Sequence, residues 1–146
     1  MRKNCLMFLL AALVAALPCA AQAADDPCFE KAQTQAQLNA CATDGLKRAD
    51  NELNSLFKQM TDRLGNDKKA RQLLVDAQRK WISFRDAECS FQVMRSAGGS
   101  IQPMRQRMCH AAITQARVLD FHKQLACGKD ADEQTAAECA VPPANK

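Results

Sequence analysis

Residues 89–109 read CSFQVMRSAGGSIQPMRQRMC and place two cysteines almost symmetrically about a glycine pair. Cys89 lies nine residues before Gly98, and Cys109 lies ten residues after Gly99. Two antiparallel helices joined at this turn would hold both cysteines at the same height, within reach of a disulfide bond. The stretch therefore predicts a helical hairpin closed by a Cys89–Cys109 disulfide.

The chain before this hairpin also has the pattern of a helix. It is rich in Ala, Leu, Gln, Lys and Arg, which favour helices, and has few β-branched residues. Thr34 and Gln37 have the spacing of a capping box, so we expect a helix from Thr34 to Gly65. Its apolar residues recur every three or four positions, which predicts one buried face: Leu38, Ala42, Leu46, Ala49, Leu53, Phe57, Met60 and Leu64.

The hairpin itself supplies two more helices. Asn66 or Asp67 can cap the second helix, and Ser100 with Pro103 is expected to open the third. The predicted core positions of the second are Ala70, Leu73, Leu74, Ala77, Trp81, Phe84 and Phe91. Those of the third are Met104, Met108, Ala111, Ala112, Val118, Leu119, His122 and Leu125. Three long helices with short connections predict an all-α fold, an antiparallel three-helix bundle over residues 24–126.

The N-terminus has the pattern of an export signal, assigned to residues 1–23. Arg2 and Lys3 precede the apolar run Cys5–Ala16, and small residues at Ala21 and Ala23 suit cleavage after Ala23. An uncleaved membrane anchor is the alternative. The run is shorter than the ~20 residues of a membrane span, and no second one follows, so no transmembrane segment is expected in the mature chain.

Removal of this signal leaves an even set of cysteines: Cys28, Cys41, Cys89, Cys109, Cys127 and Cys139. Six cysteines in a small exported chain predict three disulfides and an oxidising compartment. Cys28–Cys41 would close a folded-back N-terminal arm, and Cys127–Cys139 would hold an irregular C-terminal tail, residues 127–146. The alternative connectivity mixes Cys28 and Cys41 with Cys89 and Cys109, because all four lie near the same end of the bundle.

The charge distribution is uneven along the chain. The full sequence has 20 Lys and Arg against 16 Asp and Glu. Residues 63–123 carry an excess of about seven positive charges, whereas the flanking segments are acidic. This basic middle suits either an anionic partner or a solvated helical face. Nucleic acid is disfavoured as a partner by the export signal and by the presence of one Trp and no Tyr.

The residue types that carry most chemistry are poorly placed for it. His110 and His122 have no partner at metal-ligand spacing, since the cysteines are committed to disulfides, and His122 is interpreted as a core or boundary residue. The sequence contains no C-x-x-C motif. We therefore expect no enzyme activity, no metal site and no cofactor.

Trp81 and Arg85 are four residues apart, so the guanidinium can lie over the indole ring. Arg85 can also pair with Asp50 or Asp86. A tryptophan on an inner helical face with a covering arginine favours a role in the bundle core over a binding site.

The turn of the hairpin has the pattern of a contact loop. Gly98, Gly99 and Ser100 are small, and they are flanked by Arg95 and Arg105. Such a tip could enter an acidic cleft, where arginines meet carboxylates. These five residues are the candidate binding site; a simple helix connector is the alternative.

Several of these segments together resemble the lysozyme inhibitor LprI family, N-terminal domain. The matching motifs are Cys41-Ala42, A-D-x-x-L-N at residues 49–54, Ala77-Gln78, Trp81, F-R-D-A at residues 84–87, Cys89, Gly98-Gly99-Ser100, Cys109, Thr114, Arg117 and Leu119. Within them, the positions interpreted as structural are Asp50, Asn54, Trp81, Arg85 and Asp86.

The resemblance implies an exported, disulfide-bonded, all-helical protein of the bacterial envelope that binds and inhibits lysozyme. The chain lacks the lipobox of a lipoprotein, because Pro18 precedes Cys19. It is therefore expected to be periplasmic or secreted. The alternative function is a structural or adaptor module of the envelope that binds another protein.

Overall fold

The computed structural model describes residues 26–129 and 132–144, and every regular element in these ranges is a helix. The predicted all-α fold is confirmed. The elements in chain order are α1 (Pro27–Lys31), α2 (Gln35–Leu64), α3 (Lys68–Gln92), the 3₁₀ turn η1 (Met94–Ser96), α4 (Gln102–Ala126) and α5 (Glu133–Ala137).

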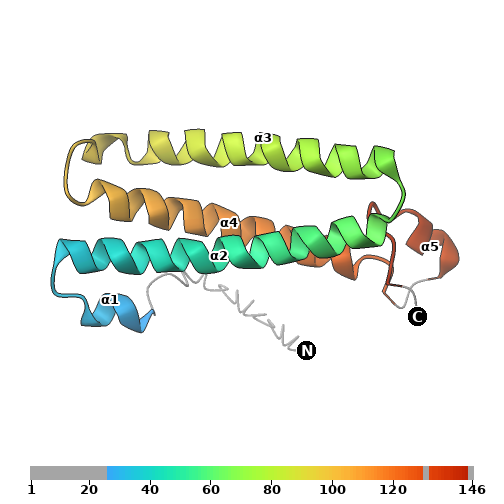
Figure 1. The fold of residues 1–146 in the computed structure, drawn as a ribbon, viewed down its shortest axis with the longest axis horizontal. Coiled ribbons are helices and arrows are strands. Elements are labelled where there is room, and N and C mark those ends of the chain that lie inside the picture. The colour runs from blue at the N-terminus through green and yellow to red at the C-terminus, as the bar shows by residue number, and fades with distance from the viewer. Residues whose placement is uncertain (1–25, 130–131, 145–146) are drawn as a thin grey trace, which may run out of the picture.

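The three long helices run antiparallel to their neighbours in sequence (Figure 1). α2 and α4 lie side by side, and α3 forms an outer layer beside this pair. The α3–α4 connection lies at the same end of the molecule as the start of α2, whereas α5 lies at the opposite end. The bundle is thus a closely packed helix pair with a third helix along its flank.

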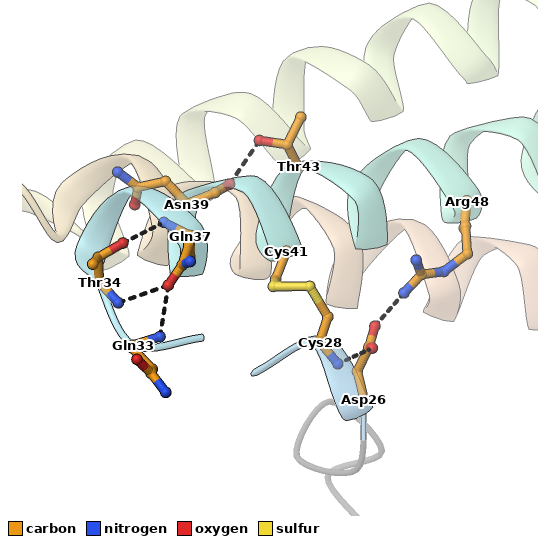
Figure 2. The surroundings of a disulfide bond; sticks show 9 residues. All are labelled: Asp26, Cys28, Gln33, Thr34, Gln37, Asn39, Cys41, Thr43 and Arg48. Atoms are coloured by element: carbon orange, nitrogen blue, oxygen red, sulfur yellow. Dashed lines mark hydrogen bonds and ion pairs between the residues drawn. A yellow bond between two sulfur atoms is a disulfide. The ribbon is translucent and has the colours of Figure 1, made fainter. Parts of the chain in front are cut away.

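The ends of the first two long helices follow from local side-chain chemistry. Thr34 Oγ1 accepts a hydrogen bond from the Gln37 backbone N–H at 3.2 Å, and Gln37 Oε1 accepts one from the Thr34 N–H at 3.0 Å (Figure 2). This is the predicted capping box. Gly65 ends α2 with φ of 51°, and Asp67 then caps α3 by accepting from the Ala70 N–H at 2.9 Å. These predicted boundaries are confirmed.

The main hydrophobic core lies between α2 and α4. Phe121 is fully buried there, against Leu53, Met60 and other apolar residues of the two helices. Val141, from beyond α4, is only 2% exposed and belongs to the same core. The prediction of an irregular tail is therefore wrong in part, because the segment contains α5 and contributes a core residue.

The predicted core face of α3 is wrong in part, although Leu74 and Trp81 pack against the core as expected. Leu73, Phe84 and Phe91 are 57%, 57% and 69% exposed, and Cys89 is the only fully buried residue of this helix. Apolar residues are spread around more than half of the helix, so their spacing does not decide which side packs inward. α3 packs inward through the side that carries the predicted Trp81 together with Arg85 and Cys89.

Three details of α4 also differ from prediction. The helix begins at Gln102, with Ile101 rather than Ser100 as the preceding residue, and no side chain caps it. Ala112 and Leu119 are exposed, although both were expected in the core. His122 is also exposed, and its Nε2 lies 3.3 Å from Glu52 Oε1 on α2.

Three disulfides cross-link the fold at both ends of the bundle. They join Cys28 to Cys41, Cys89 to Cys109 and Cys127 to Cys139, with Cα–Cα distances of 5.6, 5.7 and 5.8 Å. These are the expected pairs rather than the mixed alternative. Each closes a loop of 12 to 20 residues, which stabilises the fold by about 3 kcal/mol on the chain-entropy account.

Figure 2 shows how the first of these bonds holds α1 against α2. Asp26 caps α1 by accepting from the Cys28 N–H at 3.0 Å, and its carboxylate also pairs with Arg48 of α2. The Cys28 hydrogen bond, with the Arg48 charge, lowers the pKa of Asp26.

None of the helices in residues 26–129 and 132–144 combines the length and hydropathy needed to cross a bilayer. The predicted signal sequence lies outside the described residues.

Candidate interaction site

The connection between α3 and α4 is a short, hydrogen-bonded turn. The Gly99 N–H donates to the Ser96 carbonyl at 3.0 Å, and the Gln102 N–H donates to the Gly99 carbonyl at 3.1 Å. Gly98 has φ of 77°, a left-handed conformation that side chains with a Cβ rarely adopt. Its N–H donates to Gln102 Oε1 at 2.8 Å. Both the glycine and its hydrogen bonds define the conformation of the tip.

The structure brings the five predicted binding residues together at this tip. Gly98, Gly99 and Ser100 are exposed, as are Arg95 on η1 and Arg105 in the first turn of α4. Neither arginine forms an ion pair with any residue in the described part of the chain. Both guanidinium groups are thus available to a partner.

Arg107 behaves differently from these two arginines. Its Nη1 donates to the Pro103 carbonyl at 3.2 Å, and the residue is only half-exposed. It therefore helps to hold the first turn of α4 rather than extend from the tip.

The tip also exposes apolar side chains that the sequence reasoning did not assign to the site. Met94 is 57% exposed and Ile101 is 40% exposed, on either side of the glycine pair. The sequence could have indicated them, because Met94 and Ile101 are large apolar residues within a predicted turn. Together with the arginines they give the tip the mixed apolar and cationic character of protein-binding surfaces, where Met and Arg are enriched.

Two contacts hold the tip in place on the bundle. The Cys89–Cys109 disulfide joins the helices below it, and Cys89 is fully buried. Asn39 Nδ2 of α2 donates to the Ser100 carbonyl at 3.3 Å. The tip is therefore attached to all three long helices, which reduces its freedom before any partner binds.

Further along the bundle, Arg85 connects three helices. It is hydrogen-bonded at 3.1 Å to Asp50 of α2, to Asp86 of α3 and to the buried hydroxyl of Thr114 on α4. Its guanidinium also lies 5.3 Å from the centroid of the Trp81 ring. Both predicted carboxylate pairings of Arg85 and its position over Trp81 are confirmed. Asn54, which was grouped with these residues, is instead exposed on α2.

Arg117 covers the same aromatic region from α4. Its guanidinium lies 4.6 Å from the Phe121 ring centroid and 5.9 Å from that of Trp81. Burial lowers the pKa of Arg117, although arginine remains charged at any pH of interest. Arg85 and Arg117, which both lie over the Trp81 ring, thus help to hold α3 against α4. This is a structural role.

His110 lies at the edge of this network. Its buried Nε2 has no hydrogen-bond partner among the described residues, and Asp86 Oδ1 is 3.8 Å away, beyond hydrogen-bond range. Burial is the main cause that lowers the pKa of His110, and the charge of Arg85 adds to it. These effects outweigh Asp86 and Asp50, so the imidazole is neutral at physiological pH.

The opposite side of the α2–α4 pair carries a groove of about 320 Å³. It is lined by small residues such as Gly45 and Ala111 together with Phe29, Arg48 and Glu52. The described residues contain no group of three or more His, Cys, Asp or Glu side chains arranged to hold a metal ion. The arginine of the groove, Arg48, is already paired with Asp26, whereas the hairpin tip offers arginines without an ion pair among the described residues and exposed apolar groups.

Comparison with known proteins identifies the family of the chain. The family model described as lysozyme inhibitor LprI matches residues 28–121. The chain belongs to this family. The match spans α2, α3 and most of α4, and it includes the hairpin tip, Trp81 and Arg85.

A relative of this LprI-family chain is found in Rhizobium meliloti (strain 1021). It is an uncharacterised protein that is 34% identical over 111 residues, covering 68% of this chain and 80% of the relative. No solved structure matches the chain. Family membership thus points to lysozyme inhibition, and the disulfides fit an extracellular or periplasmic protein.

Proposed function

We propose that this protein is a non-enzymatic inhibitor of lysozyme-type muramidases, and that its α3–α4 hairpin tip enters the enzyme's cleft. The observation that carries the proposal is the exposure of Arg95 and Arg105 on a disulfide-held turn, in a chain that belongs to a lysozyme inhibitor family. Lysozyme clefts hold two functional carboxylates. Arginine pairs with carboxylates through charge-assisted, often bidentate hydrogen bonds.

The construction of the tip suits this role energetically. A loop that is ordered before binding loses less conformational entropy in the complex. The Cys89–Cys109 disulfide and the Asn39–Ser100 hydrogen bond provide that order. Met94 would add apolar area at the centre of the interface, where most binding energy is usually found.

The electrostatic attraction to lysozyme would come from the arginines of the tip rather than from the net charge of the whole protein. Many of the positive charges of the chain lie in residues 63–123, which include the tip, whereas the flanking segments are acidic. A small net charge does little for long-range steering, but two unpaired arginines next to carboxylates still contribute at close range. We infer that the protein acts in the periplasm or outside the cell, after removal of residues 1–23.

The proposal is tested by titrating the mature protein against several lysozyme types at low and high salt. We expect inhibition of at least one type at micromolar concentration, weakened about tenfold at high salt because exposed charges are screened. No inhibition of any type would contradict the proposal. Recovery of another stable protein partner, with every lysozyme unaffected, would favour an envelope adaptor instead.

A further inference from the structure

The exposed side of α3 carries a row of apolar and cationic residues that the proposed function does not use. Leu73, Phe84 and Phe91 follow one another at intervals of about three and about two helical turns, so they lie in line along one side of the helix. Lys69 and Lys80 fall in the same line, and all five side chains are exposed. We call these five residues the α3 stripe.

The α3 stripe is separate from the packed side of the helix. It lies roughly a third of a turn around α3 from Trp81, Arg85 and Cys89, which face the other helices. α3 is the outer layer of the bundle, and no other described element covers it from outside (Figure 1). The row from Leu73 to Phe91 extends over about 27 Å.

The charges on and around the stripe are predominantly positive. Lys69 and Lys80 form no ion pair with a described residue, and neither do the neighbouring exposed Lys68 and Arg79. Two half-buried acidic side chains lie beside the stripe: Asp76 accepts a hydrogen bond from Gln72 at 3.0 Å, and Glu88 accepts one from Gln92 at 2.8 Å. The stripe therefore combines exposed apolar side chains with an excess of exposed positive charge.

We propose that the α3 stripe binds the surface of an anionic phospholipid bilayer, with α3 lying in the plane of the headgroups. Apolar side chains in a row, with cations among them, are typical of helices that lie at a membrane interface. Lysines close to the surface gain from anionic headgroups, and phenylalanines enter the boundary with the acyl chains.

Other occupants fit the stripe less well. A second copy of this chain would bring two positive rows together, which is unfavourable. A protein partner normally needs a contiguous apolar centre with a polar rim, and lysine is depleted at such interfaces. Here the apolar residues are in single file, with lysines among them, which matches a planar lipid surface.

The test is flotation of the mature protein with vesicles of phosphatidylcholine mixed with phosphatidylglycerol, compared with vesicles of phosphatidylcholine alone. We expect binding to the mixed vesicles only, weakened at least about tenfold in Lys69→Glu/Lys80→Glu. The variant Phe84→Ser/Phe91→Ser should weaken binding similarly. A matched control, Lys47→Glu/Lys123→Glu, reverses two exposed lysines on other helices and should bind like the wild type.

Circular dichroism and melting temperature confirm that each variant is folded before the comparison. The proposal is overturned by no binding to either vesicle, by equal binding to both, or by equal loss in the lysine control. It is also overturned if light scattering shows a wild-type dimer that Phe84→Ser/Phe91→Ser dissociates, since the stripe would then be an interface between copies. Lysozyme inhibition by the stripe variants is expected to remain, which separates this proposal from the function of the tip.

Discussion

Arg85 on α3 and Asp50 on α2 form an ion pair with 3.1 Å between Nη1 and Oδ1. The same Nη1 donates to Thr114 Oγ1 on α4, so one guanidinium joins the three long helices. Arg85 is 14% exposed, whereas Asp50 is 40% exposed. Because α3 buries only Cys89 fully, this polar junction adds to the Cys89–Cys109 disulfide and to the partly buried Leu74 and Trp81 in holding the outer helix to the α2–α4 pair.

Substitutions of Arg85 and of Asp50 should have unequal effects on the free energy of unfolding. Arg85→Ala should lower the free energy of unfolding by about 1.5–3 kcal/mol, because the buried Thr114 hydroxyl and Trp81 lose their partner. Asp50→Asn should cost only about 0.5–1 kcal/mol, since the carboxylate is partly solvated. Urea denaturation of both variants measures the difference. A larger loss for Asp50→Asn than for Arg85→Ala would contradict this description of the junction.

The hairpin disulfide should matter for both stability and inhibition. Cys89→Ala/Cys109→Ala is expected to lose about 3 kcal/mol of stability, because a closed loop in the unfolded chain is released. Cys127→Ala/Cys139→Ala should lose a comparable amount, yet leave the hairpin tip intact, and it serves as the control. Denaturation and lysozyme titration of both variants are the measurements. Equal inhibition by the two folded variants would show that the disulfide does not organise the binding tip.

Substitution by alanine should affect stability very differently at Phe121 and Phe91. Phe121→Ala removes a fully buried ring from the main core and should destabilise the protein by about 3–5 kcal/mol. Phe91→Ala removes an exposed ring and should change stability by less than about 0.5 kcal/mol. Thermal or urea unfolding measures both. A cost at Phe91 close to that at Phe121 would mean that the outer side of α3 is packed against something in solution.

His110 should make stability depend on pH. Its pKa is lowered in the folded state, so the unfolded chain binds more protons in the range just below about pH 6.5. The free energy of unfolding is therefore highest, as far as His110 is concerned, above that pH. It decreases as the pH falls toward the folded-state pKa of His110. The charged groups around the imidazole are Arg85, Asp86, Asp50 and Arg107.

The check is the melting temperature of the wild type and of His110→Gln between about pH 7.5 and about pH 5, above the range where carboxylates titrate. The wild type should lose stability across this interval, and His110→Gln should lose less. His122→Gln, at an exposed histidine, is the control. Identical slopes for the wild type and His110→Gln would rule out the assigned role of burial at His110.

The parts of the fold that could be predicted are those set by local chemistry. The capping box of Thr34 with Gln37 needs only neighbours in sequence, and the structure has it. The spacing of Cys89 and Cys109 about a turn limits the distance between them, so their pairing followed from helix geometry.

The parts that could not be predicted depend on which surfaces meet. The apolar residues of α3 point in several directions, and only tertiary packing decides that Trp81 faces inward while Phe84 faces solvent. Val141 reaches the core because α5 and the Cys127–Cys139 disulfide turn the chain back, which no periodicity in the tail indicates. At the candidate site, glycines and arginines were visible as a pattern, whereas the exposure of Met94 required the structure.

The most direct test of the central claim is the affinity of lysozyme for the tip variant Arg95→Glu/Arg105→Glu, measured by calorimetry beside the wild type and the control Lys47→Glu/Lys123→Glu. Both double variants change the net charge equally at exposed positions, so only the location differs. We predict that the tip variant binds at least about a hundredfold more weakly, as expected when charge-assisted contacts become repulsive, while the control binds like the wild type. Equal affinity of the tip variant and the control would contradict the assignment of the hairpin tip as the lysozyme-binding site.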